Sequence, residues 1–245
     1  MSDQRISISV FFPCHNEQAN IEPLTQQALQ VITRISDDYE VIIVNDGSTD
    51  ATKEIADRLA QQDESVKAIH HPKNLGYGGA LQSGFRAAEK EWVFYTDGDG
   101  QFDIGELPDL LSLTRDYDII TCYRIDRKDS WIRKLNAWAW GKLVRFMFSL
   151  PVRDIDCAFK LYRREIFDHI EMHSQGALID TEILARAQRA GYRMVQRGVH
   201  HYPRTAGQQS GASIRVILRA FRELRKLRRE IITSSAHKQY ILNRD

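Results

Sequence analysis

The alternation of strand and helix patterns over the first hundred residues constrains the fold of this chain most strongly. Short β-rich, apolar segments cover residues 6–12, 39–44, 66–70 and 92–96. Stretches with helical spacing of apolar residues separate them, over 20–35, 51–62 and 76–89. This order predicts an α/β fold with a mostly parallel sheet, right-handed crossovers and flanking helices.

The composition fits one large globular domain with a helical extension. Of the 245 residues, 42% are hydrophobic and 27% are charged, which excludes a disordered or low-complexity chain. The three cysteines lie far apart without a CxxC pair, which argues against a disulfide scaffold or structural zinc and fits a reducing cytosol. No apolar run reaches the roughly 18–20 residues that span a bilayer. No signal peptide precedes the first strand, so a soluble or peripheral protein is expected.

The formal net charge of +1 hides an uneven distribution. Residues 1–121 hold 9 Lys and Arg against 21 Asp and Glu, a balance of −12, and residues 122–245 hold 25 against 12, a balance of +13. The acidic half could hold cations, and the basic half could hold phosphates or an anionic membrane surface. The alternative is that these charges are simply solvated.

The residues best suited to chemistry follow the predicted strands directly. Asn16 and Glu17 come after the first strand, Asp46 after the second and Asp97-Gly98-Asp99 after the fourth. Ligands of parallel α/β sheets bind beyond the carboxyl ends of the strands. We therefore expect these side chains to form one site at that edge of the sheet.

The Asp97-Gly98-Asp99 segment indicates a cation site. Two carboxylates 4 Å apart repel by about 4 kcal/mol at an effective dielectric constant near 20, and a divalent cation removes that repulsion. Oxygen ligands suit Mg²⁺ or Mn²⁺, and Mg²⁺ commonly bridges to substrate phosphates. On its own, however, an Asp-Gly-Asp-Gly sequence is often only a turn.

Several other nucleotide and nucleophile motifs are absent. The Gly76-Tyr77-Gly78-Gly79 stretch follows the third strand, and Leu81 occupies the third glycine position of a dinucleotide fingerprint. No GxxxxGK[ST] or GxSxG motif occurs, which excludes a P-loop and the usual α/β-hydrolase. Cys14-His15 has no nearby sequence partner that would favour a metal or nucleophile site. A nucleotidyltransferase lacks support because no Gly-rich loop follows the first strand.

Four segments in this order resemble family 2 glycosyltransferases with a GT-A fold: residues 12–17, 44–50, 74–76 and 97–101. More narrowly, the chain resembles the dolichyl- or polyprenyl-phosphate sugar transferases, over about residues 6–212. Cys14-His15 departs from the small and aromatic residues that are commoner there, and Asn45 replaces a frequent Asp.

The resemblance implies a nucleotide-sugar donor and a set of residues that contact its nucleotide: Pro13, Asn16, Glu17, Asp46 and Asp97. Asp46 would hydrogen-bond the nucleoside. Residue chemistry leaves alternatives open, because Asn16 can simply form a turn and Asp46 can cap a helix.

The resemblance also implies a metal pair, Asp97 and Asp99, that holds Mg²⁺ or Mn²⁺ against the diphosphate, with Asp99 the more direct ligand. Gln101 would lie beside the metal and the acceptor phosphate. The metal would neutralise the departing diphosphate. Inversion at the anomeric carbon is implied by the resemblance alone.

The second half supplies acceptor-side candidates. Arg124, Arg127 or Arg204 could hold an incoming phosphate. A phosphate acceptor is already anionic and needs alignment more than a base. A hydroxyl acceptor would need a general base, for which the candidates are Asp156, Asp180 and Glu182.

Other interpretations remain open in this half. Asp180 and Glu182 can instead stabilise the start of a helix. Arg204 and Gly207 match the family's closing loop, but Gln209 stands where a serine is usual. His200 or His201 could approach the metal, and either could equally be a packed core histidine.

Two amphipathic segments bear on membrane association. Ser213 to Arg229 carries seven Lys and Arg and one Glu, and Trp131 to Leu150 mixes Trp and Phe with Lys and Arg. Basic amphipathic helices with aromatic residues can lie in the headgroup plane, or they can pack on the core with a solvated basic face. A membrane surface, or a small transmembrane partner, would then bring the protein to a lipid acceptor.

The sequence therefore predicts a GT-A domain over residues 1–212, with a nucleotide and metal half (1–121) and an acceptor half (122–212). Residues 213–245 form a basic helical extension. The predicted function is sugar transfer from a nucleotide sugar to polyprenyl phosphate at the cytosolic face of a membrane. Alternatives are a family 2 enzyme with a saccharide acceptor and an inactive membrane or nucleic-acid adaptor, although no nucleic-acid partner is expected.

Overall fold

The computed structural model describes residues 5–125, 131–203 and 214–233, without the side chains of 131–138, 214–221 and 232. The strands are β1 (Ile8–Cys14), β2 (Tyr39–Asn45), β3 (Val66–His70), β4 (Trp92–Thr96), β5 (Ile119–Ile125), β6 (Phe159–Arg163) and β7 (Met194–His200). The helices are α1 (Ile21–Ile35), α2 (Thr52–Gln62), α3 (Tyr77–Ala87), the 3₁₀ segment η1 (Ile104–Arg115), α4 (Trp131–Phe148), α5 (Ile166–His169), α6 (Ile179–Arg189) and α7 (Ile214–Thr233).

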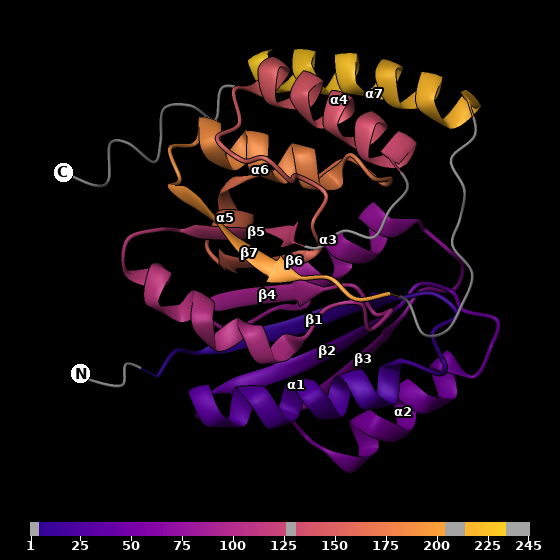
Figure 1. Cartoon of the computed structure of the whole chain (residues 1–245). Helices are drawn as coiled ribbons and strands as arrows, with labels where there is room; N and C mark the ends of the chain where they lie inside the picture. Colours follow the sequence, from indigo (N-terminus) through magenta and orange to yellow (C-terminus); the bar gives the residue numbers. More distant parts are fainter. Residues whose placement is uncertain (1–4, 126–130, 204–213, 234–245) are drawn as a thin grey trace.

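The seven strands form one sheet in the order β3-β2-β1-β4-β6-β5-β7 (Figure 1). All neighbouring pairs are parallel except those of β6, which runs antiparallel to both β4 and β5. The prediction of a mostly parallel sheet is therefore confirmed. The reversed strand β6 was not predicted.

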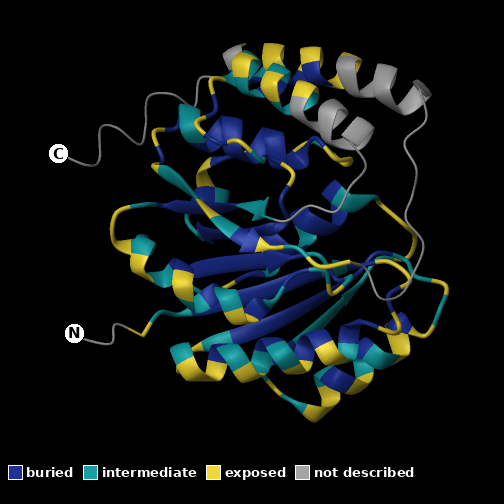
Figure 2. Cartoon of the chain, in the orientation of Figure 1, coloured by how far each residue is buried: buried dark blue, intermediate teal, exposed yellow. Residues whose placement is uncertain are grey.

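Helices cover both faces of the sheet. The first face carries α1, which packs against α2 and η1, and the other carries α3, which packs against α6 (Figure 1). The strands β1, β2, β4 and β6 are buried almost throughout, the edge strands β3 and β7 are mostly half-buried, and the outer sides of α1 and α2 are exposed (Figure 2). This two-sided cover explains the continuous apolar runs of β1, β2 and β4.

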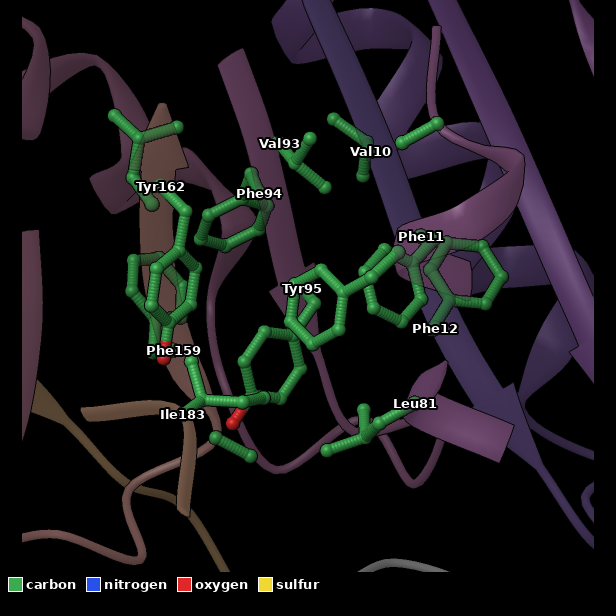
Figure 3. Close-up of a cluster of buried hydrophobic side chains, with 14 of the residues drawn as sticks. Val10, Phe11, Phe12, Leu81, Val93, Phe94, Tyr95, Phe159, Tyr162 and Ile183 are labelled. Atoms are coloured by element: carbon green, nitrogen blue, oxygen red, sulfur yellow. The ribbon is translucent and has the colours of Figure 1, made fainter. Parts of the chain in front are cut away.

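Aromatic rings fill the space between the sheet and α3. Phe85 of α3 meets Phe11, Tyr95 and Tyr162 edge-on, with ring centroids 4.9–5.6 Å apart. Figure 3 shows these strand residues side by side across β1, β4 and β6. Edge-to-face pairs add about 0.5–1.5 kcal/mol each beyond the apolar area that they bury, so this cluster fixes the strands against the helix layer.

Strand β1 continues through Pro13, although the sequence pattern predicts that the strand stops there. Cys14 accepts a hydrogen bond from the Asp46 N–H on the β2 side. Because successive residues bond to alternate neighbours in a parallel strand, the nitrogen of Pro13 faces the β4 side. The β1–β4 ladder has already ended there, at Phe11 and Tyr95. The missing N–H of proline therefore removes no ladder bond.

One edge of the sheet gathers the segments that carry polar residues. The carboxyl ends of β1, β2, β3, β4, β5 and β7 lie there because these strands run in the same direction. Antiparallel β6 instead begins there, with Phe159 opposite Thr96. Residues 154–158, which enter β6, thus join the loops that leave the parallel strands.

The described apolar residues of helix α7 pack onto the protein. Leu224, Leu227 and Ile231 are buried, and α7 contacts α6. The exposed side includes Arg222, Arg225, Lys226, Arg228 and Arg229. Among the residues that the structure describes, no helix is both long and apolar enough to cross a membrane.

Candidate active site

The turn after β4 is held against the end of β1 by a close backbone contact. A Cβ atom on Gly98 would lie 2.6 Å from Cys14 Sγ and 2.7 Å from the carbonyl oxygen of Pro13. Only glycine allows this approach. Pro13 therefore lies directly beside the Asp97–Asp99 turn. In the sheet, β1 lies between β2 and β4, so the loops that leave these three strands meet near Pro13.

Asp97 carries the clearest sign of a missing partner. Within the described residues, its Oδ1 atom is buried and accepts no hydrogen bond. Burial and the nearby charge of Asp99 raise the pKa of Asp97 to about 7, although a hydrogen bond from Tyr77 opposes this shift. A carboxylate in this setting favours a positive neighbour.

The carboxylate pair fits a metal that arrives together with a phosphate-bearing ligand. In the described part of the chain, no group of three or more His, Cys, Asp or Glu side chains is arranged to hold an ion. Mg²⁺ and Mn²⁺ need only one or two carboxylates when substrate phosphates supply further ligands. Asp97 and Asp99 would hold the ion on the protein side.

Asp99 and Gln101 form a compact turn that reaches the end of β7. Asp99 Oδ1 accepts a hydrogen bond from the Gln101 N–H at 3.1 Å. Gln101 Nε2 donates to the Tyr202 carbonyl at 2.9 Å, and the Tyr202 N–H donates to the Gln101 carbonyl at 2.9 Å. The side chain predicted to face the acceptor phosphate thus ties the segment after β7 to the metal turn.

The two histidines at the end of β7, His200 and His201, face different neighbours. The backbone N–H of His200 donates to Glu106 Oε1 at 3.0 Å, and the ring nitrogen Nδ1 lies 3.2 Å from the same oxygen. The ring of His201 meets Phe102 edge-on at 5.0 Å between centroids. Of the two histidines, His201 therefore lies nearer to Gln101, because it contacts the next residue, Phe102.

Asn16 holds the loop after β2. It adopts a left-handed backbone conformation with φ of 59°, which asparagine tolerates well. Its Oδ1 accepts from the Thr49 N–H at 2.8 Å, and its own N–H donates to Ser48 Oγ at 2.9 Å. The turn-forming interpretation of Asn16 thus accounts for its side chain in this structure.

Glu17 is buried at the start of α1. Its N–H donates to Thr52 Oγ1 at 2.9 Å, and its Oε2 accepts from Asn20 Nδ2 at 2.6 Å. Asp50 also accepts from the Thr52 N–H at 3.0 Å, so Asp50 binds the N–H of the first residue of α2. Asn16 and Glu17 together lock the first loop to the second, and nucleotide contact by either stays a prediction.

Asp46 caps no helix and holds residues 71–76 instead. Its Oδ1 accepts from His71 Nδ1 at 2.7 Å and from the Leu75 N–H at 2.8 Å, and its Oδ2 accepts from the Gly76 N–H at 3.0 Å. Beyond this loop, His71 Nε2 lies 2.8 Å from Ser83 Oγ.

The sequence did not indicate His71 and Ser83, because residues 12 apart, one following a strand and one in a helix, show no periodic signal. Their distances to each other and to Asp46 resemble those of a hydrolase triad. However, the His71 and Asp46 side chains are only 8% and 5% exposed. We assign them to the support of the loop that borders the expected nucleotide site.

Glu182 acts within the acceptor half as an anchor. It is fully buried, and its Oε2 accepts from the N–H groups of His173 and Ser174 at 3.0 and 2.7 Å. Its Oε1 accepts from Arg186 Nε at 2.9 Å. The segment held in this way meets α3, where the Gly78 N–H donates to the Gln175 carbonyl at 2.9 Å. Both oxygens of Glu182 thus accept hydrogen bonds from the protein, and we assign Glu182 no catalytic role.

Asp180 belongs to a buried ion pair. Its Oδ1 accepts from Lys160 Nζ at 2.6 Å and from the Tyr95 hydroxyl, and Lys160 also donates to Tyr95 at 2.8 Å. Lys160 is fully buried and Asp180 is 2% exposed. Asp180 thus does not serve simply to stabilise the start of α6.

Asp156 and Arg124 lie at the same edge of the sheet. The Asp156 side chain is open to solvent, yet the protein around it and the charge of Asp180 raise its pKa to about 6. Arg124 donates from Nε and Nη2 to Asp154 at 3.0 and 2.9 Å. This pairing of Arg124 with Asp154 was not predicted from the sequence. Arg127 and Arg204 lie outside the described residues.

Comparison with known proteins gives a family and a fold. The model of the family described as Glycosyl transferase family 2 matches residues 9–171. Glycosyltransferase AglD from Haloferax volcanii is 35% identical over 209 residues, which are 81% of this chain and 34% of that protein. The undecaprenyl-phosphate 4-deoxy-4-formamido-L-arabinose transferase of Aeromonas hydrophila is 31% identical, over 66% of this chain and 50% of that protein. The chain thus spans half or less of the length of these two relatives.

Solved structures share the same arrangement of strands and helices. Glucosyl-3-phosphoglycerate synthase from Mycobacterium tuberculosis, in complex with Mn²⁺, uridine diphosphate and glucosyl-3-phosphoglycerate, has a TM-score of 0.63 and 18% identity. The match covers 93% of this chain and 77% of that one. This likeness confirms the predicted GT-A type of fold.

Proposed function

The chain belongs to glycosyl transferase family 2, and from that premise we propose that it transfers a sugar from a nucleotide-diphosphate donor to a polyprenyl phosphate. The observation that carries the donor half of this proposal is the buried Oδ1 of Asp97, beside Asp99, which has no hydrogen-bond partner within the described residues. A metal bound to a diphosphate would place a positive charge beside this carboxylate. The Mn²⁺ and uridine diphosphate named for the M. tuberculosis enzyme support the same class of ligand.

The protein's own residues would position the donor. Asp97 and Asp99 would hold the metal and, through it, the diphosphate, while Pro13 and the loop held by Asp46 would border the nucleoside. Gln101 would keep the segment after β7 against this turn through its two bonds with Tyr202. The bound metal would supply charge neutralisation for the leaving diphosphate. With a preformed phosphate nucleophile, the site needs alignment of the two substrates more than a base.

The acceptor half of the proposal rests on the relatives and on the basic half of the chain. A relative that is 31% identical is named an undecaprenyl-phosphate sugar transferase. Two nitrogens of Arg124 already donate to Asp154. We therefore propose that Arg124 attracts the acceptor phosphate through its positive charge and does not bind it with two hydrogen bonds.

Peripheral contact with a membrane, at its cytosolic face, would bring a lipid acceptor to this site. The described apolar residues of α7, Leu224, Leu227 and Ile231, are buried against the protein, so its exposed arginines and lysine would contact anionic headgroups electrostatically. Phe146 of α4 is 84% exposed, and an aromatic ring of this kind suits the interface between headgroups and acyl chains. A small transmembrane partner remains an additional proposal.

A saccharide acceptor is the second candidate, and Asp156 is the observation that favours it. Asp156 is an exposed residue at this edge of the sheet, and desolvation of its carboxyl raises the pKa to about 6, which suits a general base for a hydroxyl nucleophile near neutral pH. Under this alternative, Asp156→Asn would remove most of the transfer activity. Under the polyprenyl phosphate proposal it would leave the rate within a few-fold.

The donor proposal is tested by thermal unfolding with UDP, GDP, CDP and dTDP, each in Mn²⁺, Mg²⁺ or EDTA. A nucleotide at 100 times its Kd stabilises the protein by about 2.7 kcal/mol. We expect one nucleotide to stabilise the wild type only with metal, and its effect to vanish in Asp99→Ala. No shift with any nucleotide would contradict the proposal.

A further inference from the structure

Arg153 lies in the segment that enters β6 and takes no part in the mechanism proposed above. It is exposed, and its guanidinium carbon lies 3.3 Å from the centroid of the Tyr123 ring. Among the residues that the structure describes, no carboxylate forms an ion pair with this guanidinium. A guanidinium that stacks on a ring keeps the N–H groups at its edge open to a ligand.

Arg163 shows the same stacking in a purely structural setting. Its guanidinium carbon lies 4.7 Å from the centroid of the Trp92 ring, and its Nη1 also lies 3.1 Å from Glu91 Oε1. Arg163 and Trp92 are opposite each other at the other edge of the sheet. Arg153 has a ring beneath it without such a carboxylate, so its charge is available to an anionic ligand.

Strand β7 holds both the ring and the backbone of this arginine. Tyr123 is opposite Gly198, where a Cβ atom would lie 3.0–3.1 Å from three atoms of the tyrosine side chain, so the ring lies close over the β7 backbone. Gln196 Oε1 accepts from the Arg153 N–H at 2.8 Å, and its Nε2 donates to the Asp154 carbonyl at 2.8 Å. The stack is therefore anchored on two sides.

The register of the sheet places Tyr123 in the same row as Asp97. Leu161 of β6 is opposite both Phe94 of β4 and Ile120 of β5 (Figure 1). Asp97 and Tyr123 each lie three residues further along, in the same direction, because β4 and β5 both run antiparallel to β6. Their side chains thus leave the same face of the sheet, two strand spacings or about 10 Å apart. This span leaves room for a sugar between a metal-bound diphosphate and a second anion.

The same segment lies next to the helix proposed to meet the membrane. A Cβ atom on Gly141 of α4 would lie 3.9 Å from the Arg153 carbonyl oxygen. Phe146, which is 84% exposed, follows five residues later, about 7.5 Å along the helix axis. An anion at Arg153 would therefore lie close to the surface that contacts lipid in the proposed function.

We propose that Arg153, held on the Tyr123 ring, binds the phosphate of the lipid acceptor with two hydrogen bonds. This inference rests on the proposed function and adds a residue to its acceptor side. The planar guanidinium matches two phosphate oxygens, and the ring fixes the plane in which they are bound. Arg124 would contribute charge alone, whereas Arg153 would align the phosphate toward the donor.

The first experiment measures sedimentation with phosphatidylcholine vesicles, with and without undecaprenyl phosphate. These vesicles carry no other anionic lipid, so the basic side of α7 finds no general anionic surface. We expect Arg153→Gln to weaken the binding that depends on undecaprenyl phosphate by about 10- to 100-fold. Arg153→Lys should recover only part of it, because an ammonium lacks the fork. Arg34→Gln, which removes an exposed arginine of α1, should match the wild type.

The ring is tested by Tyr123→Leu, which keeps the charge of Arg153 and removes the surface on which it stacks. We expect this variant to bind undecaprenyl phosphate several-fold more weakly, and Tyr123→Phe, which keeps the ring, to lose less. In the transfer reaction, Arg153→Gln should raise the KM for undecaprenyl phosphate and leave the KM for the nucleotide sugar unchanged. Calorimetry of nucleotide binding with Mn²⁺ and thermal unfolding check that the donor site and the fold are intact.

Three results would overturn this inference while the proposed function stands. The first is an Arg153→Gln variant with the wild-type Kd and KM for undecaprenyl phosphate. The second is an equal loss in Arg34→Gln, which would indicate a general effect of charge. The third is an equal loss of nucleotide binding in Arg153→Gln, because the disturbance would then not be confined to the acceptor. If the wild type neither binds undecaprenyl phosphate nor glycosylates it, the proposed acceptor fails first and the inference fails with it.

Discussion

Gln101 and Tyr202 are joined by two hydrogen bonds, one from the Tyr202 N–H to the Gln101 carbonyl and one from Gln101 Nε2 to the Tyr202 carbonyl, both 2.9 Å long. They lie 101 residues apart in the chain. The contact connects the turn that carries Asp99 with the segment that leaves β7. A displacement of one of these segments is therefore expected to displace the other.

Gln101→Glu tests this connection with almost no change in size. The introduced carboxylate cannot donate to the Tyr202 carbonyl, so one bond is lost and two acceptors face each other. We expect a loss of about 1 kcal/mol in the free energy of unfolding and at least a tenfold loss in transfer rate. Gln101→Asn, which keeps an amide donor on a shorter arm, should lose less. Unchanged rates in Gln101→Glu would show that the contact has no part in transfer.

Gly98→Ala should destabilise the protein by about 1–3 kcal/mol, because the added carbon has no room between Cys14 Sγ and the Pro13 carbonyl. The loss of metal-dependent nucleotide binding should be larger than this instability explains, since the Asp97–Asp99 turn must move. Chemical denaturation and calorimetry measure the two effects.

Gly176→Ala is the control for that variant. A Cβ atom at Gly176 would meet nothing within 4 Å, so both stability and nucleotide binding should stay close to the wild type. Equal behaviour of the two alanine variants would contradict the account of the turn.

Asp97→Asn should make the free protein more stable at high pH. Because burial and Asp99 raise the pKa of Asp97 to about 7 from 3.8, the folded wild type binds this proton more tightly than the unfolded chain does. Its stability therefore falls as the pH rises from about 4 to about 7. One pKa unit corresponds to about 1.4 kcal/mol, so this contribution is on the order of 4 kcal/mol.

Denaturation of both proteins at pH 4.5, 6 and 8 measures this effect. The stability gain of Asp97→Asn over the wild type should be largest at pH 8 and small at pH 4.5. The same variant should lose metal-dependent nucleotide binding, since an amide does not replace a carboxylate ligand. A gain that is independent of pH would rule out the raised pKa.

Neutralising the outer side of α7 tests membrane contact. Arg222, Arg225 and Arg229 are exposed, and each basic residue near an anionic surface contributes about 1 kcal/mol. The triple change to Gln should weaken sedimentation with anionic liposomes by roughly 100-fold at low salt, with little effect on unfolding. Wild-type binding should also weaken as salt is added.

The control neutralises three exposed basic residues on the opposite face: Arg34, Lys53 and Arg115. These lie on α1, α2 and the end of η1. The net charge changes by the same amount, yet liposome binding should be retained. An equal loss in both triple variants would indicate a general effect of net charge, and no binding by the wild type would refute the membrane proposal.

The sequence predicted the parts of the fold that have a clear period. Strands β3 and β4 match their predicted ranges, and α1 begins one residue after its predicted start. The reversed direction of β6 was not predicted, because the sequence of a short buried strand does not indicate which way it runs. Its pairing with β4 and β5 determines that direction. The continuation of β1 through Pro13 depends on where the ladder to β4 ends, which is also a property of the tertiary structure.

The candidate site shows the same limit. Residues after strand ends could be placed at one edge of the sheet from their order alone. Their partners could not, because Lys160 of β6, His71 after β3 and Asp154 before β6 contact their partners only once the sheet is assembled. One of these contacts had a signal in the sequence, which is the single lysine, Lys160, within the apolar residues of β6. It indicates a buried acidic partner, since lysine is almost never fully buried unpaired.

Transfer itself is the most direct test of the account. The protein is incubated with undecaprenyl phosphate, Mn²⁺ and a panel of UDP-, GDP-, CDP- and dTDP-sugars, and lipid products are detected by mass spectrometry. We predict one or a few donors to yield a polyprenyl phosphate that carries the sugar, with no product in EDTA or with Asp99→Ala. A protein that binds a nucleotide with metal but glycosylates only saccharides would contradict the polyprenyl phosphate acceptor. A protein that yields no product with any donor or acceptor would contradict the assignment as a transferase.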